Sequence, residues 1–257
     1  ARIKEFINQG FKEIVLTGIH LCSYGLDLNT KSSLLELLRE IESLKGLLRL
    51  RLSSLDPRFL SPSLMEHITA SNKVCPYFHL SLQSGSDDIL HRMGRKIRVE
   101  DYKNILASLR EKSPQASLGA DIIVGFPGET EDDFSQTYRF LEQSALTYLH
   151  VFSYSPRPGT AAASWQQVNG KVKKERARLL RDLSSRKNTN FRRLFVGKEC
   201  EAIVIRKEKA RAEVLTSNYF NVFIPSCPHD GGKEVRVEIK KVDTGKTTGQ
   251  IVNSSSS

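Results

Sequence analysis

The sequence has few cysteines and no long hydrophobic run. Its 257 residues include four cysteines, Cys22, Cys75, Cys200 and Cys227, and the closest two stand 27 positions apart. They are too few and too scattered for a disulfide scaffold, which favours a cytoplasmic protein in a reducing compartment. No window reaches the apolar length of a membrane span and no signal peptide precedes the first expected strand, so no membrane partner is expected.

Charge of one sign is also unevenly spread along the chain. The net charge is +10, yet residues 1–170 hold 19 Lys and Arg against 19 Asp and Glu, whereas residues 171–257 hold 20 against 10. The whole surplus lies in the last third. Basic clusters gain affinity for polyanions by displacing phosphate counterions, so this part is expected to face a nucleic acid, although a lone charge-rich helix in solvent often shows the same bias.

Strand and helix patterns alternate over the first 155 residues. Apolar runs that end in Gly, Ser or Pro predict strands at 12–18, 47–55, 77–85, 117–127 and 148–155. Amphipathic patterns between them predict helices at 33–44, 61–70, 87–92, 98–112 and 129–144. This alternation through short loops indicates an α/β fold with a parallel sheet buried by helices; periodicity does not decide whether the sheet closes into a barrel.

The pattern changes after residue 170. Residues 171–195 predict one long basic helix, with ten basic residues against two acids. Beyond it the period becomes two, in short strands separated by Gly and Asn turns, which indicates a small antiparallel barrel. We therefore expect an α/β unit at 1–170, a linking helix at 171–195, a β-barrel at 196–253 and a disordered tail at 254–257.

Five collinear stretches together resemble one enzyme family. They are EIVLTGIHLCSYGLDL (13–28), RLSSLDP (51–57), FHLSLQSGSDDILHRMGRK (78–96), DIIVGFPGETEDDF (121–134) and HVFSYSPRPGTAA (150–162). With these motifs the chain resembles the radical S-adenosylmethionine tRNA methylthiotransferases, most of all the subgroup that acts on threonylcarbamoyladenosine at tRNA position 37. The closing β module resembles TRAM, an RNA-binding barrel found at the end of such enzymes.

The resemblance implies a fold and an activity. Residues 1–170 would be a partial radical SAM (β/α) barrel with strands two to six, followed by the all-β TRAM barrel. The implied enzyme adds a methylthio group to C2 of N6-threonylcarbamoyladenosine at position 37 of the tRNA anticodon loop. It would need S-adenosylmethionine, two [4Fe–4S] clusters and an electron donor.

The family's CxxxCxxC loop, which ligates one of those clusters, has no counterpart in this sequence. By the resemblance, that loop and an N-terminal domain with the second cluster would precede residue 1. We therefore expect a fragment that ligates neither cluster and is inactive by itself.

Two other interpretations stay open. The enzyme could be a sister methylthiotransferase that modifies isopentenyladenosine 37 or an aspartate of a ribosomal protein. From a different class, the chain could be a cluster-free RNA-binding protein that keeps a dead barrel. A CxxxCxxC loop encoded upstream of Ala1 would exclude the last of these.

Candidate cofactor ligands stand at the carboxyl ends of the expected strands, where such folds bind ligands. In GFPG, the glycines around Pro127 let the backbone approach a flat ring or simply serve a tight turn. In LQSGS, Gln83 needs a hydrogen-bond partner, whereas Ser84 or Ser86 could cap the next helix. The full set of candidates is Thr17, Gly18, Gln83, Ser84, Gly85, Arg92, Gly125, Pro127, Gly128 and Tyr154. No catalytic residue and no metal ligand is assigned.

Three further polar residues are left outside this site. His79 and His150 lie in expected strands and are taken to be packed, hydrogen-bonded residues. Asp121 begins the DIIVG run, which would place it at the end of the strand away from the ligand site. A buried carboxylate there would need a partner.

Candidate RNA contacts come from the basic helix and from the β module. Tyr219, beside Asn218 in an expected hairpin turn, could stack on an unpaired base, whereas Phe220 and Phe223 fit the barrel core at least equally well. The candidates are Lys173, Lys174, Arg178, Arg181, Arg192, Arg193 and Tyr219.

Overall fold

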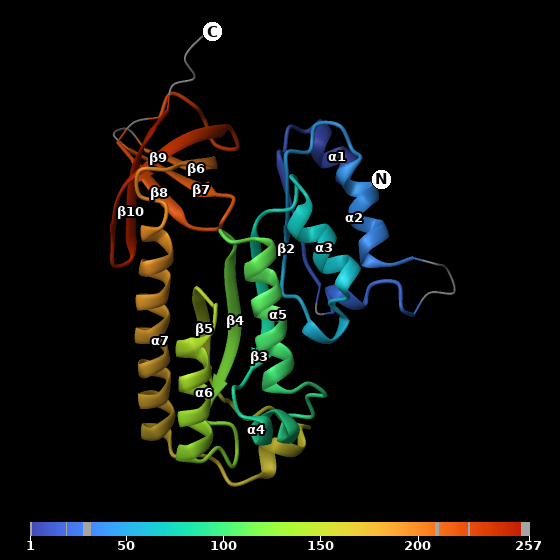
Figure 1. Cartoon of the computed structure of the whole chain (residues 1–257), viewed down its shortest axis with the longest axis vertical. Coiled ribbons are helices and arrows are strands. Elements are labelled where there is room, and N and C mark those ends of the chain that lie inside the picture. Colours follow the sequence, from blue (N-terminus) through green and yellow to red (C-terminus); the bar gives the residue numbers. More distant parts are fainter. Residues whose placement is uncertain (1, 19, 28–31, 209–210, 226, 253–257) are drawn as a thin grey trace.

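The computed structural model describes residues 2–18, 20–27, 32–208, 211–225 and 227–252. The predicted tail at 254–257 lies outside this part. Figure 1 shows a small barrel at the upper left, the first helices and strands (blue) beside it at the upper right, the other strands and helices below, and one long helix that runs beside these strands and ends at the barrel.

Helices and strands alternate in the first part of the chain, as predicted, with ends shortened by a few residues. In order they are α1 (Arg2–Asn8), β1 (Glu13–Leu16), α2 (Leu34–Glu42), β2 (Arg49–Leu52), α3 (Pro62–Ala70), β3 (Tyr77–Gln83), α4 (Asp87–Arg92), α5 (Val99–Lys112), β4 (Ser117–Val124), α6 (Glu131–Gln143) and β5 (Tyr148–Ser153). Short 3-10 helices lie at Leu21–Ser23, Pro57–Phe59 and Ala161–Ser164.

Side-chain caps fix where several helices begin. The Ser33 hydroxyl accepts a hydrogen bond from the Glu36 amide at the start of α2, and Ser61 does the same for Leu64 in α3, where Pro62 takes the first helical position. Thr130 caps α6 in a capping box with Asp133. Each such cap contributes about 1 kcal/mol to helix stability.

All neighbouring strands of this part are parallel, but they form two sheets rather than one. β1 pairs with β2, while β3, β4 and β5 form a three-stranded sheet. Only isolated bridges, such as Leu55 with Leu80, join the two. The expected single sheet is therefore wrong: β2 ends at Leu52, and beyond it Leu55 forms a single bridge to β3 instead of a continuous ladder.

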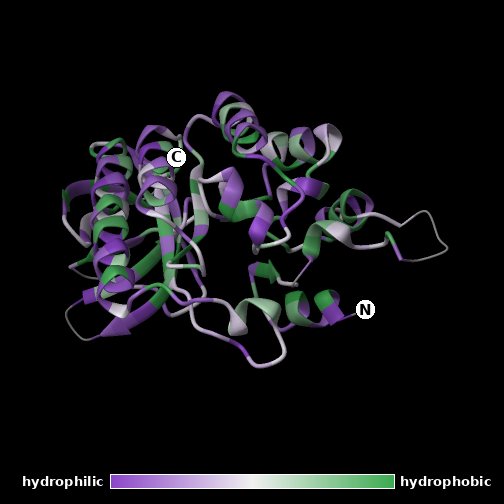
Figure 2. Ribbon diagram, turned by 90° about the horizontal axis from the view of Figure 1, so that it is seen from below, coloured by the Kyte–Doolittle hydropathy of each residue, from purple (hydrophilic) through white to green (hydrophobic). Residues whose placement is uncertain are grey.

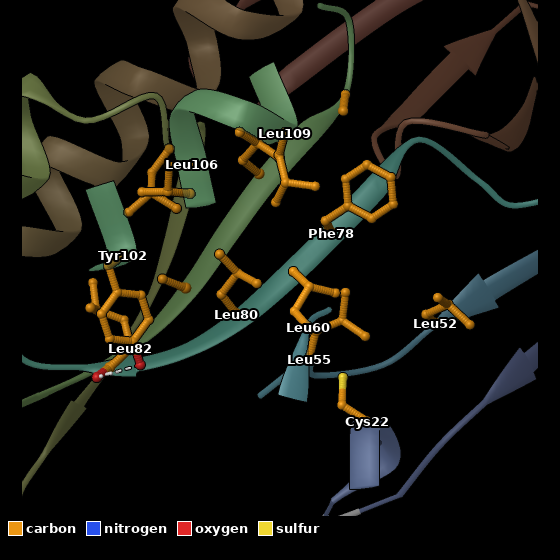
Figure 3. Close-up of a cluster of buried hydrophobic side chains, with 14 of the residues drawn as sticks. Cys22, Leu52, Leu55, Leu60, Phe78, Leu80, Leu82, Tyr102, Leu106 and Leu109 are labelled. Atoms are coloured by element: carbon orange, nitrogen blue, oxygen red, sulfur yellow. Dashed lines mark hydrogen bonds between the residues drawn. The ribbon is translucent and has the colours of Figure 1, made fainter. Parts of the chain in front are cut away.

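The main hydrophobic core fills the space between the three-stranded sheet and its helices. Figure 3 shows the packing of Tyr102, Leu106 and Leu109 from α5 near Phe78, Leu80 and Leu82 from β3. The Tyr102 hydroxyl also donates a hydrogen bond to the Leu82 carbonyl at 3.3 Å. Burying one such side chain stabilises the fold by about 1.5–3 kcal/mol. Figure 2 shows hydrophilic and hydrophobic residues alternating along the helices, as expected where one side covers a sheet.

The second part is a closed barrel with the strand order β10-β8-β7-β6-β9. Its strands are β6 (Glu199–Glu208), β7 (Arg211–Thr216), β8 (Asn221–Ile224), β9 (Glu234–Asp243) and β10 (Lys246–Ile251). The small barrel is confirmed, with one correction, since β10 meets β8 in parallel at Thr248 and Phe223. Phe220 lies in the barrel core, which was one of the two roles predicted for it, the other being base stacking.

α7 (Gly170–Arg193) covers nearly the whole range predicted as a basic helix, and it belongs to both hydrophobic cores. Leu180 and Leu183 are buried in the main core, while Phe191 packs with Phe195 and Phe220 inside the barrel core. The helix is therefore partly buried and packs against both parts of the chain.

Candidate functional site

A pocket of about 770 Å³ lies at the carboxyl ends of β3, β4 and β5. Its volume falls in the range of small-molecule sites. The polar lining includes Gln83, Arg92, Arg95, Asp121, Arg157 and Thr160, and the apolar lining includes Ile123, Phe126, Phe152, Tyr154 and Trp165. Three guanidinium groups and one carboxylate line the pocket, so it can pair with an anionic group of a ligand, such as a carboxylate.

The GFPG turn reaches this pocket through Phe126, and its glycines allow close packing around it. Gly125 has φ +70° and Gly128 has φ +85°, a backbone region that suits glycine. A Cβ at Gly125 would lie 2.2 Å from the Lys173 side chain, and one at Gly128 would lie 2.0 Å from Arg92. The positive φ angles thus favour glycine at both positions, and Gly125 also leaves room for the Lys173 side chain. Pro127 is buried between them, and a cofactor role for these three residues stays a prediction.

A buried ion pair holds this turn in place. The Gly125 amide donates to the Glu129 carboxylate at 2.8 Å, and the Arg176 guanidinium donates to the same carboxylate oxygen at 2.6 Å. Arg176 also pairs with Glu131 at 3.0 Å and lies over the Phe134 ring. Burial raises the pKa of Glu129, and the hydrogen bonds from Gly125 and Arg176 oppose that effect. Arg176 is therefore a structural residue of the turn.

The LQSGS motif divides between the pocket and the helix behind it. Gln83 lines the pocket, is 9% exposed and has φ +79°, a conformation that costs a non-glycine residue about 1–3 kcal/mol. Ser84 and Gly85 instead contact Thr137 of α6, through the Ser84 hydroxyl and the Gly85 amide. Ser86 caps α4, so of the two serines predicted as possible caps it is Ser86, not Ser84, that takes this role.

Tyr154 contributes its ring to the apolar wall of the pocket and has a hydroxyl without a hydrogen-bond partner. Its ring packs edge-to-face on Phe126, with centroids 5.2 Å apart, and its hydroxyl is buried with no hydrogen-bond partner among the described residues. A buried hydroxyl without a partner costs free energy, so a ligand that supplies one is favoured. Thr17 and Gly18 follow β1 of the other sheet and are not among the pocket-lining residues.

Beside the pocket lies a hydrogen-bonded network of side chains that the sequence did not predict. The Tyr148 hydroxyl lies 2.7 Å from His79 Nδ1, and His79 Nε2 lies 3.0 Å from Asp121 Oδ1. His150 Nδ1 lies 3.5 Å from the same carboxylate oxygen. We call these four residues the histidine network. Gly119 makes room for it, because a Cβ there would lie 1.9 Å from the Tyr148 ring.

Two expectations are corrected by this network. β4 begins at Ser117, so Asp121 lies mid-strand and lines the pocket rather than standing at the far end. His79 is buried as expected, but the His150 side chain is 50% exposed. Burial opposes ionisation of Asp121, yet hydrogen bonds from His150 and His79 hold its pKa well below the ordinary value. The three potential ligand atoms lie within 4.8 Å of one another, and Asp121 accepts hydrogen bonds from both imidazoles.

The predicted RNA contacts fall into exposed and buried sets. Lys174, Arg181 and Arg193 are exposed on α7, and Arg178 is exposed but paired with Glu175 and Asp182. Lys173 is half-buried, with its ammonium 3.4 Å from the Tyr154 carbonyl. Assignments of these residues to RNA stay predictions.

Arg192 is corrected to a structural residue. It is 5% exposed, and its guanidinium donates to the Thr247 hydroxyl at 2.7 Å and to the Asp243 carbonyl at 3.2 Å. These contacts attach α7 to the barrel and leave the group unavailable to a phosphate. Tyr219 is 47% exposed, with its ring 4.3 Å from that of Tyr77 between the barrel and β3.

The four cysteines are all buried and free. Burial raises the pKa of the Cys22, Cys75 and Cys200 thiols to about 11, so they remain protonated near neutral pH. Within the described ranges, the one group of three potential metal-ligating side chains contains no cysteine. These residues do not fit an iron–sulfur cluster, which needs closely grouped thiolates.

Comparison with known sequences identifies the family. The sequence model described as "Radical SAM superfamily" matches residues 1–141. The chain belongs to the radical SAM superfamily. The expected fold, an α/β radical SAM unit followed by a small all-β barrel, is confirmed. Membership implies S-adenosylmethionine and iron–sulfur chemistry.

Individual relatives are similar over most of this chain. Threonylcarbamoyladenosine tRNA methylthiotransferase MtaB of Aquifex aeolicus is 39% identical over 91% of this chain and 55% of that protein. The protein of the same name from Thermotoga maritima is 41% identical over 76% and 45%. tRNA-2-methylthio-N(6)-dimethylallyladenosine synthase of Acetivibrio thermocellus is 39% identical over 95% and 52%. This radical SAM chain thus spans about half the length of these curated relatives.

The pocket, but not the cysteines, fits the cofactors of the superfamily. An unpartnered Tyr154 hydroxyl, aromatic walls and several arginines suit a nucleoside with a charged amino-acid tail, such as S-adenosylmethionine. Among the described residues, no group of thiolates suited to an iron–sulfur cluster is present. Among the helices that the structure describes, none combines the length and apolar character needed to cross a membrane.

Proposed function

We propose that this chain supplies the cofactor pocket and RNA-facing surface of a tRNA methylthiotransferase that acts on threonylcarbamoyladenosine 37 in the anticodon loop. The observation that supports it most is the pocket at the carboxyl ends of β3 to β5, in a chain whose relatives include proteins named for that reaction. The proposed product carries a methylthio group at C2 of the adenine ring. Two [4Fe–4S] clusters and an electron donor belong to the proposed reaction, and neither cluster is assigned to ligands in this chain.

Within this proposal, each part of the pocket has a stated task. When bound, S-adenosylmethionine would supply the 5′-deoxyadenosyl radical. Gln83 would hydrogen-bond the ribose or the amino-acid end, and Arg92 would bind the carboxylate, since guanidinium and carboxylate groups match in geometry. Phe126 and Tyr154 would pack against the adenine and exclude water. Thr17 and Gly18, which follow β1 of the other sheet, remain candidates on resemblance alone.

The basic surface supports tRNA as the partner. Lys174 and Arg181 are exposed on α7 and have no ion pair within the part of the chain that is described, so their charges are available to phosphates. Arg193 extends this surface toward the barrel. A cytoplasmic location is part of the same proposal, because tRNA modification takes place there.

The test compares tRNA nucleosides by mass spectrometry. Cells that lack the gene for this protein should lose 2-methylthio-N6-threonylcarbamoyladenosine, and the intact gene should restore it. A Gln83→Asn variant tolerates the left-handed backbone but shortens the amide, so it should restore far less. Gln136→Asn, on the exposed side of α6, is the matched control and should restore the nucleoside fully.

Other results would redirect the proposal. If threonylcarbamoyladenosine keeps its methylthio group in the deletion strain, the proposed substrate is wrong. Loss from isopentenyladenosine instead would favour the reaction named for the Acetivibrio thermocellus relative. If every methylthio nucleoside persists, the next candidates are the ribosomal aspartate and a cluster-free RNA-binding role.

A further inference from the structure

The histidine network lies on the same face of the sheet as the cofactor pocket. Leu118, Ala120 and Ile122 of β4 point into the main core, so Asp121 between them points to the opposite face. Asp121 lines the pocket, and on β5 His150 precedes the pocket residue Phe152 by two positions. Residues two apart on a strand lie about 7 Å apart on one face. A ligand in the pocket that extends toward the amino ends of the strands therefore reaches His150 next.

The space beyond the network is filled. Tyr148 stacks with Tyr77, and the Tyr77 ring contacts Tyr219 of the barrel. The Arg51 guanidinium lies 4.8 Å from the centroid of Tyr219 and donates to the Ser217 carbonyl at 3.0 Å. These contacts close the sheet face at the amino ends of the strands. His150 thus stands at the inner end of the accessible region.

The network leaves one polar atom of His150 open. Asp121 is ionised and can only accept hydrogen bonds, so His79 Nε2 and His150 Nδ1, which face it, each carry a proton. His79 Nδ1 is satisfied by Tyr148. His150 Nε2 has no hydrogen-bond partner among the described residues, on a side chain that is 50% exposed. This atom accepts a hydrogen bond when the imidazole is neutral and donates one when it is protonated.

We propose that the histidine network is the binding site for a polar N6 substituent on the target adenosine, with His150 as the contacting residue. The inference rests on the proposed function for its substrate and adds the residues that select it. A threonylcarbamoyl group carries an amide N–H, a hydroxyl and a carboxylate, each able to pair with His150 Nε2. An isopentenyl group carries none, and it would leave the imidazole desolvated and unpaired. Sites built around such a hydrogen bond discriminate strongly against analogues that lack it.

The test measures binding of stem-loop RNAs to the 257-residue chain by fluorescence anisotropy. Two RNAs of one sequence carry N6-threonylcarbamoyladenosine or N6-isopentenyladenosine at position 37. The chain should bind the first about five- to tenfold more tightly, as expected from one hydrogen bond in a partly desolvated site. His150→Phe should bring this ratio within about twofold of one. His150→Gln, which can still hydrogen-bond, should keep part of it.

Two further variants separate recognition from folding. Asp121→Asn keeps the side-chain volume but no longer fixes the protonated nitrogen of His150, so it should lower the ratio without replacing the imidazole. His229→Phe changes an exposed histidine in the barrel and should leave the ratio as in the unmodified chain. A preference that survives His150→Phe, a ratio near one in the original chain, or no binding of either RNA would each overturn the proposal.

This ratio is independent of the reaction test. If cells with the gene make the methylthio nucleoside while the ratio is near one, the histidine network is not the selecting site and the proposed function stands. If the ratio depends on His150 but no methylthio product is found in cells, the recognition site stands and the proposed reaction fails.

Discussion

Replacing Arg176 by Met should destabilise the fold strongly, because it would leave the buried Glu129 carboxylate without its counter-charge. The side chains of Arg176 and Glu129 are 6% and 2% exposed, and their charged atoms lie 2.6 Å apart. Removing one partner of a buried pair typically costs about 3–5 kcal/mol, since the other charge stays in a poorly solvated site. Methionine keeps most of the apolar contact with Phe134, so the loss reports on the charge rather than on a cavity.

The cost of this substitution should depend on pH in a defined direction. The folded-state pKa of Glu129 is already raised by burial, and without Arg176 it should rise further. A carboxyl group whose pKa is higher in the folded than in the unfolded state stabilises the fold below its unfolded pKa, and this contribution is lost as pH rises through the folded pKa. Arg176→Met should therefore lose most stability at neutral pH and recover part of it as the solution is acidified and Glu129 becomes protonated.

Urea unfolding followed by circular dichroism, at pH 7 and near pH 5, measures both effects. A double variant with Glu129→Gln should recover much of the loss at pH 7, because a neutral amide needs no counter-charge. Arg178→Met, on the exposed side of the same helix, is the matched control and should change stability little. A loss below about 1 kcal/mol for Arg176→Met, or one that is equal at both pH values, would refute this account of the turn.

Two other substitutions test the attachment of α7 to the barrel and the packing of the histidine network. Arg192→Met should lower the free energy of unfolding by about 1–3 kcal/mol, because the Thr247 hydroxyl and the Asp243 carbonyl lose a buried donor. Arg193→Met, at the exposed neighbouring position, should leave it nearly unchanged. Equal unfolding midpoints for the two variants would contradict the burial assigned to Arg192. Gly119→Ala should destabilise the fold by about 1–3 kcal/mol through overlap with the Tyr148 ring, measured by thermal unfolding, and a Tyr148→Leu background should relieve it. An unchanged melting temperature in Gly119→Ala would count against the position of that ring.

The order of helices and strands could be predicted because it is encoded locally. Period-two and period-3.6 patterns, capping serines such as Ser33 and Ser61, and the change of period after α7 are all visible in short windows. The division of the strands into two sheets was missed. It depends on the path between β2 and β3, where only isolated bridges form, and no short window contains that information.

The site was only partly predictable for a similar reason. Gln83 was found because a polar residue at the end of an apolar strand stands out in the sequence. His79, Asp121 and His150 lie on three strands separated by two helical crossovers, and only the strand register brings them together. The burial of Arg176 and Arg192 likewise depends on acceptors that lie tens of residues away, at Glu129 and Thr247.

The helix shared by the two cores also fixes a length. Leu183 is anchored among the strands and Phe191 inside the barrel, and eight residues of helix separate them by about 12 Å. One residue added or removed between them would turn the barrel by about 100° around the helix axis and shift it by about 1.5 Å. Tyr219 could then no longer reach Tyr77. Substitutions on the exposed side of residues 184–190 should be tolerated, whereas any change in their number should not.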